Sequence, residues 1–146
     1  MAIISAVCNS FKQEILEAEH NFTASTGNTF NLALYDSDAS LGAGTTAYSS
    51  SEEITNTSGT AYSAKGKALT SVTPTLDSST AVCDFADISW TSASFTARGC
   101  LIFNDSHATD ASVCAIDFGG DKTATSGTFT IQFPAAGAST AIIRIA

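Results

Sequence analysis

The spacing of the hydrophobic residues changes near residue 28, and this change constrains the fold more than any other feature. Before it, five apolar residues recur at steps of three or four, which is the spacing of one helix face: Val7, Phe11, Ile15, Ala18 and Phe22. After it the spacing becomes two, as in residues 29–35, where Phe30, Leu32 and Leu34 alternate with other side chains. The sequence therefore predicts one amphipathic helix followed by strands.

The helix is predicted to run from Val7 to about His20, since residues 21–28 are rich in Thr, Ser and Gly. Ser10 followed by Gln13 has the spacing of a capping box, with Asn9 as an alternative cap. A single amphipathic helix has to bury its apolar face against the sheet of its own domain or against a neighbouring subunit.

Seven further segments after residue 35 are short, rich in Thr and β-branched residues, and in several cases separated by Ser, Gly, Asp or Pro. They are residues 67–72, 80–85, 87–91, 95–104, 112–119, 127–133 and 141–145. Without a second helical pattern, this layout predicts an all-β fold, either an antiparallel β-sandwich or a jelly-roll-like barrel. We expect one domain over residues 1–146, with the helix segment in 1–28 and the sandwich in 29–146.

Residues 36–66 are predicted to form a long extended arm within this sandwich, because they contain few large apolar side chains. A structureless segment of this length is usually functional or mobile. Its string Thr46-Ala-Tyr-Ser recurs at Thr60, which is weak evidence of a repeat. Because the arm has too little apolar surface to pack on itself, we expect the arm and the helix to contact other subunits. The predicted interface side chains are Phe11, Ile15, Tyr48, Ile54 and Tyr62.

Charge and hydropathy exclude two classes of partner. The chain has 14 acidic and 6 basic residues, a net charge of −8, and its Lys and Arg residues are scattered. Nucleic-acid binding needs clustered basic residues, so it is not expected. Residues 1–8 are apolar but lack the basic flank of a secretory signal, and no run approaches the roughly 18 apolar residues of a membrane span. We therefore expect no membrane partner and a protein that stays or assembles in a cytoplasm.

The four cysteines lie far apart in the sequence, so no pair has the spacing of a zinc site or a redox motif. Each lies in an apolar or alternating stretch. We interpret them as buried free thiols that act as small hydrophobic side chains: Cys8, Cys83, Cys100 and Cys114.

No catalytic or cofactor-binding residues are predicted. The chain has neither a nucleophile elbow nor a phosphate-binding loop, and His20 and His107 have no ligand at metal-binding spacing. Trp90 and Phe95 are predicted to be core residues.

Acidic residues are the one feature that could hold an ion. Asp36 and Asp38 begin one loop, but Leu41 stands where the calcium loop of an EF-hand needs glycine. Other acidic residues follow in the second half of the chain: Asp105, Asp110, Asp117 and Asp121. Because Asp is also common in ordinary turns, we predict no metal site, with a structural ion as the alternative.

A series of short motifs along nearly the whole chain carries a resemblance. They are Asn-Ser-Phe-Lys at residues 9–12, Thr-Phe-Asn-Leu-Ala-Leu-Tyr at 29–35, the stretch 59–69, Phe-Ala-Asp-Ile-Ser-Trp at 85–90, the stretches 96–104 and 116–122, and Gly-Thr-Phe-Thr-Ile at 127–131. In this order they resemble small structural proteins of tailed-bacteriophage virions. These motifs are structural, and none of them names a reaction.

The resemblance implies a non-enzymatic capsid decoration (cement) protein that binds the outer surface of the shell and stabilises it. The implied partners are the major capsid protein and further copies of the chain, in a homo-oligomer such as a trimer. The implied location is the capsid surface, after assembly in the host bacterial cytoplasm. The alternatives are a tail or fibre component and a receptor- or carbohydrate-binding module. Exposure of Tyr35, Tyr48 and Tyr62 on one face would favour sugar binding.

Overall fold

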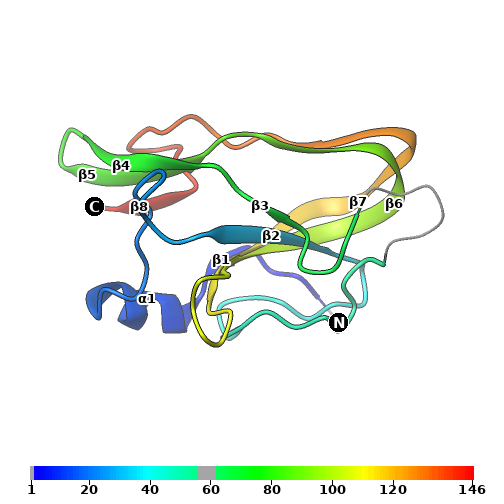
Figure 1. The fold of residues 1–146 in the computed structure, drawn as a ribbon, viewed down its shortest axis with the longest axis horizontal. Helices are drawn as coiled ribbons and strands as arrows, with labels where there is room; N and C mark the ends of the chain where they lie inside the picture. The colour runs from blue at the N-terminus through cyan, green and yellow to red at the C-terminus, as the bar shows by residue number, and fades with distance from the viewer. Residues whose placement is uncertain (1, 56–61) are drawn as a thin grey trace.

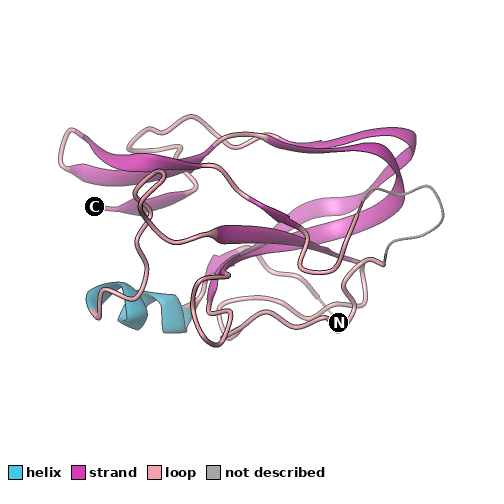
Figure 2. Cartoon of the chain, in the orientation of Figure 1, coloured by secondary structure: helices cyan, strands magenta, loops and turns pink. Residues whose placement is uncertain are grey.

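The computed structural model describes residues 2–55 and 62–146, and within them the protein is an all-β sandwich with one short helix (Figures 1 and 2). Two antiparallel sheets are present, with strand orders β1-β7-β6-β2-β3 and β4-β5-β8. The elements are β1 Ala6–Val7, α1 Asn9–Leu16, β2 Phe30–Tyr35, β3 Lys67–Ala68, β4 Ser71–Asp77, β5 Thr80–Phe85, β6 Ile88–Asn104, β7 Ser112–Ile131 and β8 Ile143–Ile145. The predicted fold class is therefore confirmed.

The long hairpin of β6 and β7 forms the frame of the molecule. It curves round one end, so that the two paired strands contribute to both layers (Figure 1). The pairing shifts register at four places, and such bulges bend a strand pair. Close contact at the bend depends on Gly99, where a Cβ atom would lie 2.5 Å from the carbonyl oxygen of Ile116 and 2.8 Å from Cδ1 of Ile3.

Helix α1 is shorter than predicted and has a different cap. It ends at Leu16, and Ala18 has a φ of 61°, which takes the chain out of the helical conformation. The N-cap residue is Cys8, without a side-chain cap hydrogen bond, so the predicted capping box is wrong. Phe22 nevertheless reaches the core, because the extended segment after α1 stacks its ring on Phe30 at a centroid distance of 4.2 Å.

Several predicted strands are parts of longer ones. Residues 87–91 and 95–104 belong to β6, and 112–119 and 127–133 largely to β7, because hairpin pairing continues through the Ser- and Gly-rich steps between them. The predicted strand 67–72 divides into β3 and β4, which lie in different sheets. Strand β5 has the predicted bounds, and β8 begins two residues later than predicted.

The described parts of the arm, residues 36–55 and 62–66, lie against the sandwich. They make isolated bridges from Leu41 to Ile3, from Ala47 to Ala111 and from Glu53 to Tyr35. The arm therefore covers the sheet of its own chain. The second copy of the four-residue repeat lies partly outside the described residues.

Candidate functional site

The structure buries three of the five predicted interface side chains. Phe11, Ile54 and Tyr62 belong to the core cluster, and Tyr62 is fully buried. Ile15 and Tyr48 are half-buried and pack against core residues. Phe11, Ile54 and Tyr62 therefore present no surface to a partner. The prediction for them is corrected, because Ile54 and Tyr62 of the arm and Phe11 of α1 all pack on their own chain.

A buried carboxylate fixes the arm to the sheet. Glu53, which is 7% exposed, accepts hydrogen bonds from the hydroxyl of Tyr62 at 2.6 Å and from that of Tyr48 at 2.5 Å. The Tyr62 hydroxyl in turn accepts the backbone N–H of Leu34 in β2 at 2.9 Å. These bonds join two arm positions to the central sheet, and such satisfied polar networks specify one arrangement of a core.

The tyrosines form no exposed platform. Burial, followed by the nearby Glu53, raises the pKa of Tyr35 and Tyr62 well above the ordinary value. Burial and the hydrogen bond to Glu53 raise the pKa of Tyr48 to about 12. The Tyr35 hydroxyl donates to the carbonyl of Ser49 at 2.7 Å. A flat aromatic surface for sugar stacking is therefore not made by these three residues.

The fold brings a third acidic residue of the arm, Glu52, to the two that the sequence analysis identified, Asp36 and Asp38. Carboxylate oxygens of Asp36, Asp38 and Glu52 lie within 4.8 Å of one another. One Asp36 oxygen already accepts the backbone N–H of Asp38 at 2.9 Å. Exposed acidic groups often gather without an ion, so this cluster alone does not define a metal site.

The other four predicted acidic residues are in ion pairs. Lys65 of the arm lies 3.0 Å from Asp105 and 2.8 Å from Asp110, which raises the pKa of its amine. Arg98 of β6 pairs with two carboxylates of β7, Asp117 at 3.3 Å and Asp121 at 3.6 Å. The N–H of Gly119 and then Arg98 lower the pKa of Asp117. These pairs hold loops and strands together.

The two histidines connect the N-terminal segment to the loop between β6 and β7. His20 is buried, with Nε2 2.8 Å from Glu14 and Nδ1 3.1 Å from the amide nitrogen of Asn104. Because that amide nitrogen also donates to the Glu19 carbonyl, Nδ1 of His20 accepts and Nε2 carries the proton. His107 lies 2.6 Å from Glu19. Both rings are therefore engaged in structural contacts.

All four cysteines are free and buried, as predicted. Burial raises the pKa of every one of these thiols, in the case of Cys83 to about 12. Such thiols contain little thiolate and are poor nucleophiles.

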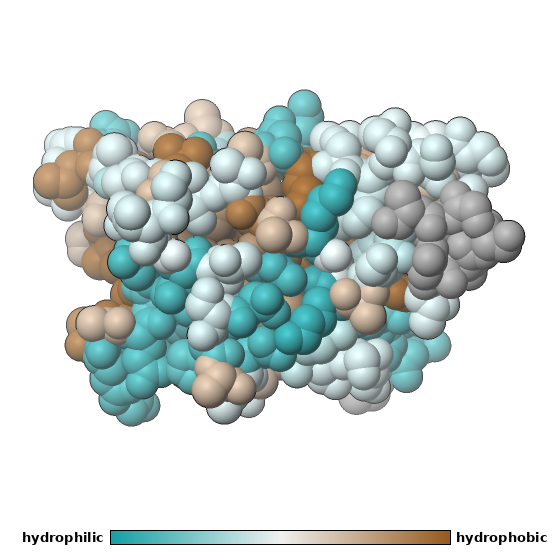
Figure 3. All heavy atoms as spheres, in the orientation of Figure 1, coloured by the Kyte–Doolittle hydropathy of each residue, from teal (hydrophilic) through white to brown (hydrophobic). Residues whose placement is uncertain are grey.

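Exposed hydrophobic side chains gather at the end of the molecule formed by α1 and the three-stranded sheet. A groove of about 400 Å³ lies between them, and its lining includes Ile15, Ala81, Cys83, Ile143 and Ile145. Figure 3 shows hydrophobic residues along this end, over β4, β5 and β8 and beside α1. Four of the five exposed large hydrophobic residues of the described chain belong to these elements. One of them, Val72, lies on the other face of the sheet, and the remaining three are Leu16, Leu76 and Ile145. We call these three residues and the groove the apolar end.

Strand pairing places Leu76 on the groove side of the sheet. Leu76 pairs with Ala81, and Ala81 pairs with Ile145, so the three side chains share one face. Sequence reasoning missed this surface. The signal was present in Leu16, which follows Ile15 but lies off the helical stripe, and in Leu76, which lies between Thr75 and Asp77.

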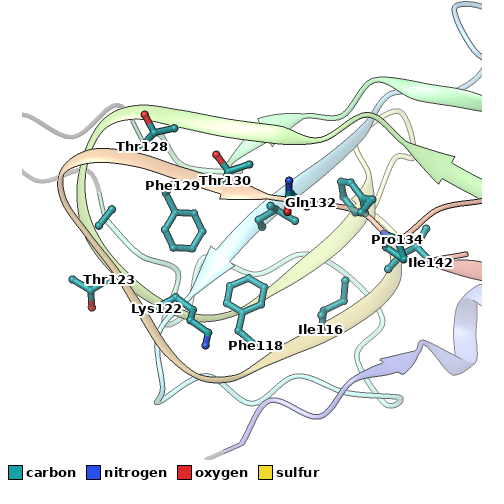
Figure 4. Close-up of a pocket in the computed structure, with 13 residues that line it drawn as sticks. Ile116, Phe118, Lys122, Thr123, Thr128, Phe129, Thr130, Gln132, Pro134 and Ile142 are labelled. Carbon is teal, nitrogen blue, oxygen red and sulfur yellow. The ribbon is translucent and has the colours of Figure 1, made fainter. Parts of the chain in front are cut away.

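A second hollow of about 500 Å³ lies inside the curved hairpin (Figure 4). Phe118 and Phe129 come from the two halves of the bent strand β7 and face one another, with ring centroids 6.3 Å apart. Lys122 lines the same pocket. Sequence reasoning did not identify this site, because it depends on the fold of a single long strand back towards itself.

No protein-family model matches this sequence, and no curated protein or solved structure matches it with significance. The resemblance to phage virion proteins therefore stays a prediction. In the described part of the chain, no helix has the length and apolar character needed to cross a membrane.

Proposed function

We propose that this protein is a non-enzymatic structural protein of a tailed-bacteriophage virion. Its role in this proposal is that of a capsid decoration protein, which binds the outer surface of the shell and stabilises it. Its partners are the major capsid protein and further copies of itself, in an oligomer such as a trimer. The proposal rests on the resemblance carried by the sequence motifs and on the apolar end.

The apolar end is the observation that carries the binding role. Leu16 is 88% exposed, Leu76 72% and Ile145 56%, and all three belong to the elements that enclose one groove. Exposed large apolar side chains that gather at one end of a protein are typical of a surface that a partner covers. We therefore place the contact with the capsid, or with a neighbouring copy on it, at this end.

The charge distribution supports an outward-facing position. A chain with a net charge of −8 is repelled by packaged DNA, and five of its six basic residues already bind acceptors within the described chain. The side chains that most often perform catalysis are also engaged: both histidines are hydrogen-bonded and the four thiols are buried. These features favour a binding protein over an enzyme.

A tail or fibre component is the second candidate, since the apolar end serves equally well for attachment there. The carbohydrate-binding alternative loses its best support, because Tyr35 and Tyr62 are buried and Tyr48 donates its hydroxyl to Glu53.

The test is a pelleting assay with capsids that lack this protein. The double variant Leu76→Ser and Ile145→Ser removes exposed apolar surface, so it should fold normally and lose about tenfold or more in capsid affinity. Val72→Ser is the matched control, because Val72 is also exposed on β4 but pairs with Asp84, on the opposite face of the sheet. Wild-type protein that binds tails and not capsids would move the proposal to the second candidate. Full capsid binding by the double variant would contradict the apolar end as the contact.

A further inference from the structure

The pocket inside the curved β6–β7 hairpin has the size and lining of a small-molecule site. Its volume of about 500 Å³ falls within the usual range of ligand pockets, about 300–1,000 Å³. The walls are aromatic and aliphatic, with Phe118 and Ile116 on one side and Phe129 on the other (Figure 4), and Ile131 also lines the pocket. Threonine side chains lie at the margin, among them Thr123 and Thr128. A ligand here needs an apolar body.

The order of the strands in the sheet explains why one side of this pocket is open to solvent. Strand β1 pairs with β7 only at Cys114 and Ala115, and no other strand of the described chain continues along that edge. Among the described residues, no neighbouring strand closes the space between the two halves of β7. Phe118, Ile131 and Phe133 are only partly buried there.

Strand register places Lys122 on the inner face of the hairpin. Lys122 pairs with Ala97, which is fully buried in the core, and directly paired residues share a face. Between the pairs Gly99–Asp117 and Ala97–Lys122, β7 advances five residues while β6 advances two. This large bulge lets β7 turn, and Lys122 returns to the inner face beyond it.

The acidic neighbours of Lys122 are engaged elsewhere. Asp117 and Asp121 both pair with Arg98, which follows the inward-facing Ala97 and so lies on the outer face of the hairpin. Within residues 2–55 and 62–146, Lys122 is the one Lys or Arg side chain without a hydrogen-bond or ion-pair partner. Although the chain has 14 acidic residues, none of the described ones pairs with this amine, which lines an apolar pocket.

We propose that this pocket binds a small amphipathic carboxylate, such as a medium-chain fatty acid. The hydrocarbon chain lies against Phe118 and Phe129, where its burial supplies most of the affinity. The carboxylate lies at the pocket margin and pairs with the amine of Lys122. Because Lys122 is exposed, the pair contributes modestly and mainly sets the orientation of the ligand.

Trp90 provides the readout, since it is the one tryptophan of the chain. Its ring centroid lies 6.3 Å from that of Phe129, which lines the pocket. Titration with brominated decanoate, below its micelle concentration, should quench Trp90 fluorescence saturably. Acetate, which has the carboxylate without the chain, should neither bind nor displace it.

Lys122→Met should weaken decanoate binding about two- to fivefold, the effect of one exposed ion pair, and leave the binding of decanol unchanged. Lys12→Met on α1 is the matched control and should change neither. Ala124→Leu should weaken both ligands by filling the pocket. If Ala124→Leu has an abnormal melting temperature, the wild-type protein is used in its place. Plain decanoate should then displace the brominated probe from it. Absence of saturable quenching, or of displacement, would show that the pocket binds no such ligand. Equal binding of acetate would show that the hydrocarbon chain of the ligand contributes nothing. Wild-type affinity of Lys122→Met for decanoate would show that Lys122 does not pair with the carboxylate.

Discussion

At the scale of single residues, all three tyrosines of the chain hold the arm against the sheet. Tyr48 and Tyr62 donate to Glu53, and Tyr35 donates to Ser49. In each case burial is the main cause of the raised pKa, so the folded state keeps its phenols protonated. The unfolded chain ionises them near the ordinary pKa of about 10.

This difference predicts alkaline unfolding. Groups with a raised pKa in the folded state contribute stability that is complete below about pH 10 and is lost as the pH rises further. We expect phenolate absorbance to appear together with the loss of β-sheet circular dichroism, in one cooperative step well above pH 10. Gradual ionisation of all three tyrosines near pH 10, in protein that stays folded, would contradict the described burial.

The thiols allow a second prediction at this scale. Because burial raises the pKa of all four, a thiol reagent should label the folded protein very slowly at neutral pH. In denaturant, without reductant, the same reagent should find four thiols per chain. A count of two would show a disulfide that the structure does not contain.

At the scale of elements, the arm depends on the carboxylate of Glu53. Glu53→Ala leaves the hydroxyls of Tyr48 and Tyr62 without their acceptor, at a cost of about 1–3 kcal/mol for a buried group. We expect a lower melting temperature and faster proteolysis within residues 36–55. Glu52→Ala, at the adjacent exposed position, is the control and should change stability little. Equal effects of the two variants would mean that the buried network does not hold the arm.

The strands were predictable where local pattern and pairing agree. In β5 the sequence boundaries and the paired residues coincide, from Thr80 to Phe85. In β6 they do not: the steps around Ser92, which has a φ of 52°, resemble a turn, yet Ala93 still pairs with Gly127. Pairing with a distant strand overrides local propensity there.

The site residues were less predictable, because their roles depend on contacts far apart in sequence. Tyr62 stands out in a polar segment, but the sequence does not show its partners, the carboxylate of Glu53 and the N–H of Leu34, which is 28 residues away. Periodicity likewise predicts Phe22 on the helix face, although the chain leaves the helix at Ala18 and brings Phe22 to the core from an extended segment. A sequence pattern therefore predicts which side chains are buried better than it predicts which residues they contact.

At the scale of the whole molecule, the apolar surface is concentrated at the α1 and β4–β5–β8 end, away from the curve of the hairpin (Figures 1 and 3). The chain as a whole is rich in Ser and Thr and has a net charge of −8. Such a concentration of apolar surface suits a protein that attaches by one end and presents the rest to solvent.

The most direct test of the proposed function is a cryo-electron microscopy map of capsids saturated with this protein. We expect density for the sandwich on the outer surface of the shell, with the apolar end facing the shell or a neighbouring copy and the curved hairpin facing solvent. Density confined to the tail, or a capsid-bound molecule with Leu76 and Ile145 exposed to solvent, would contradict it.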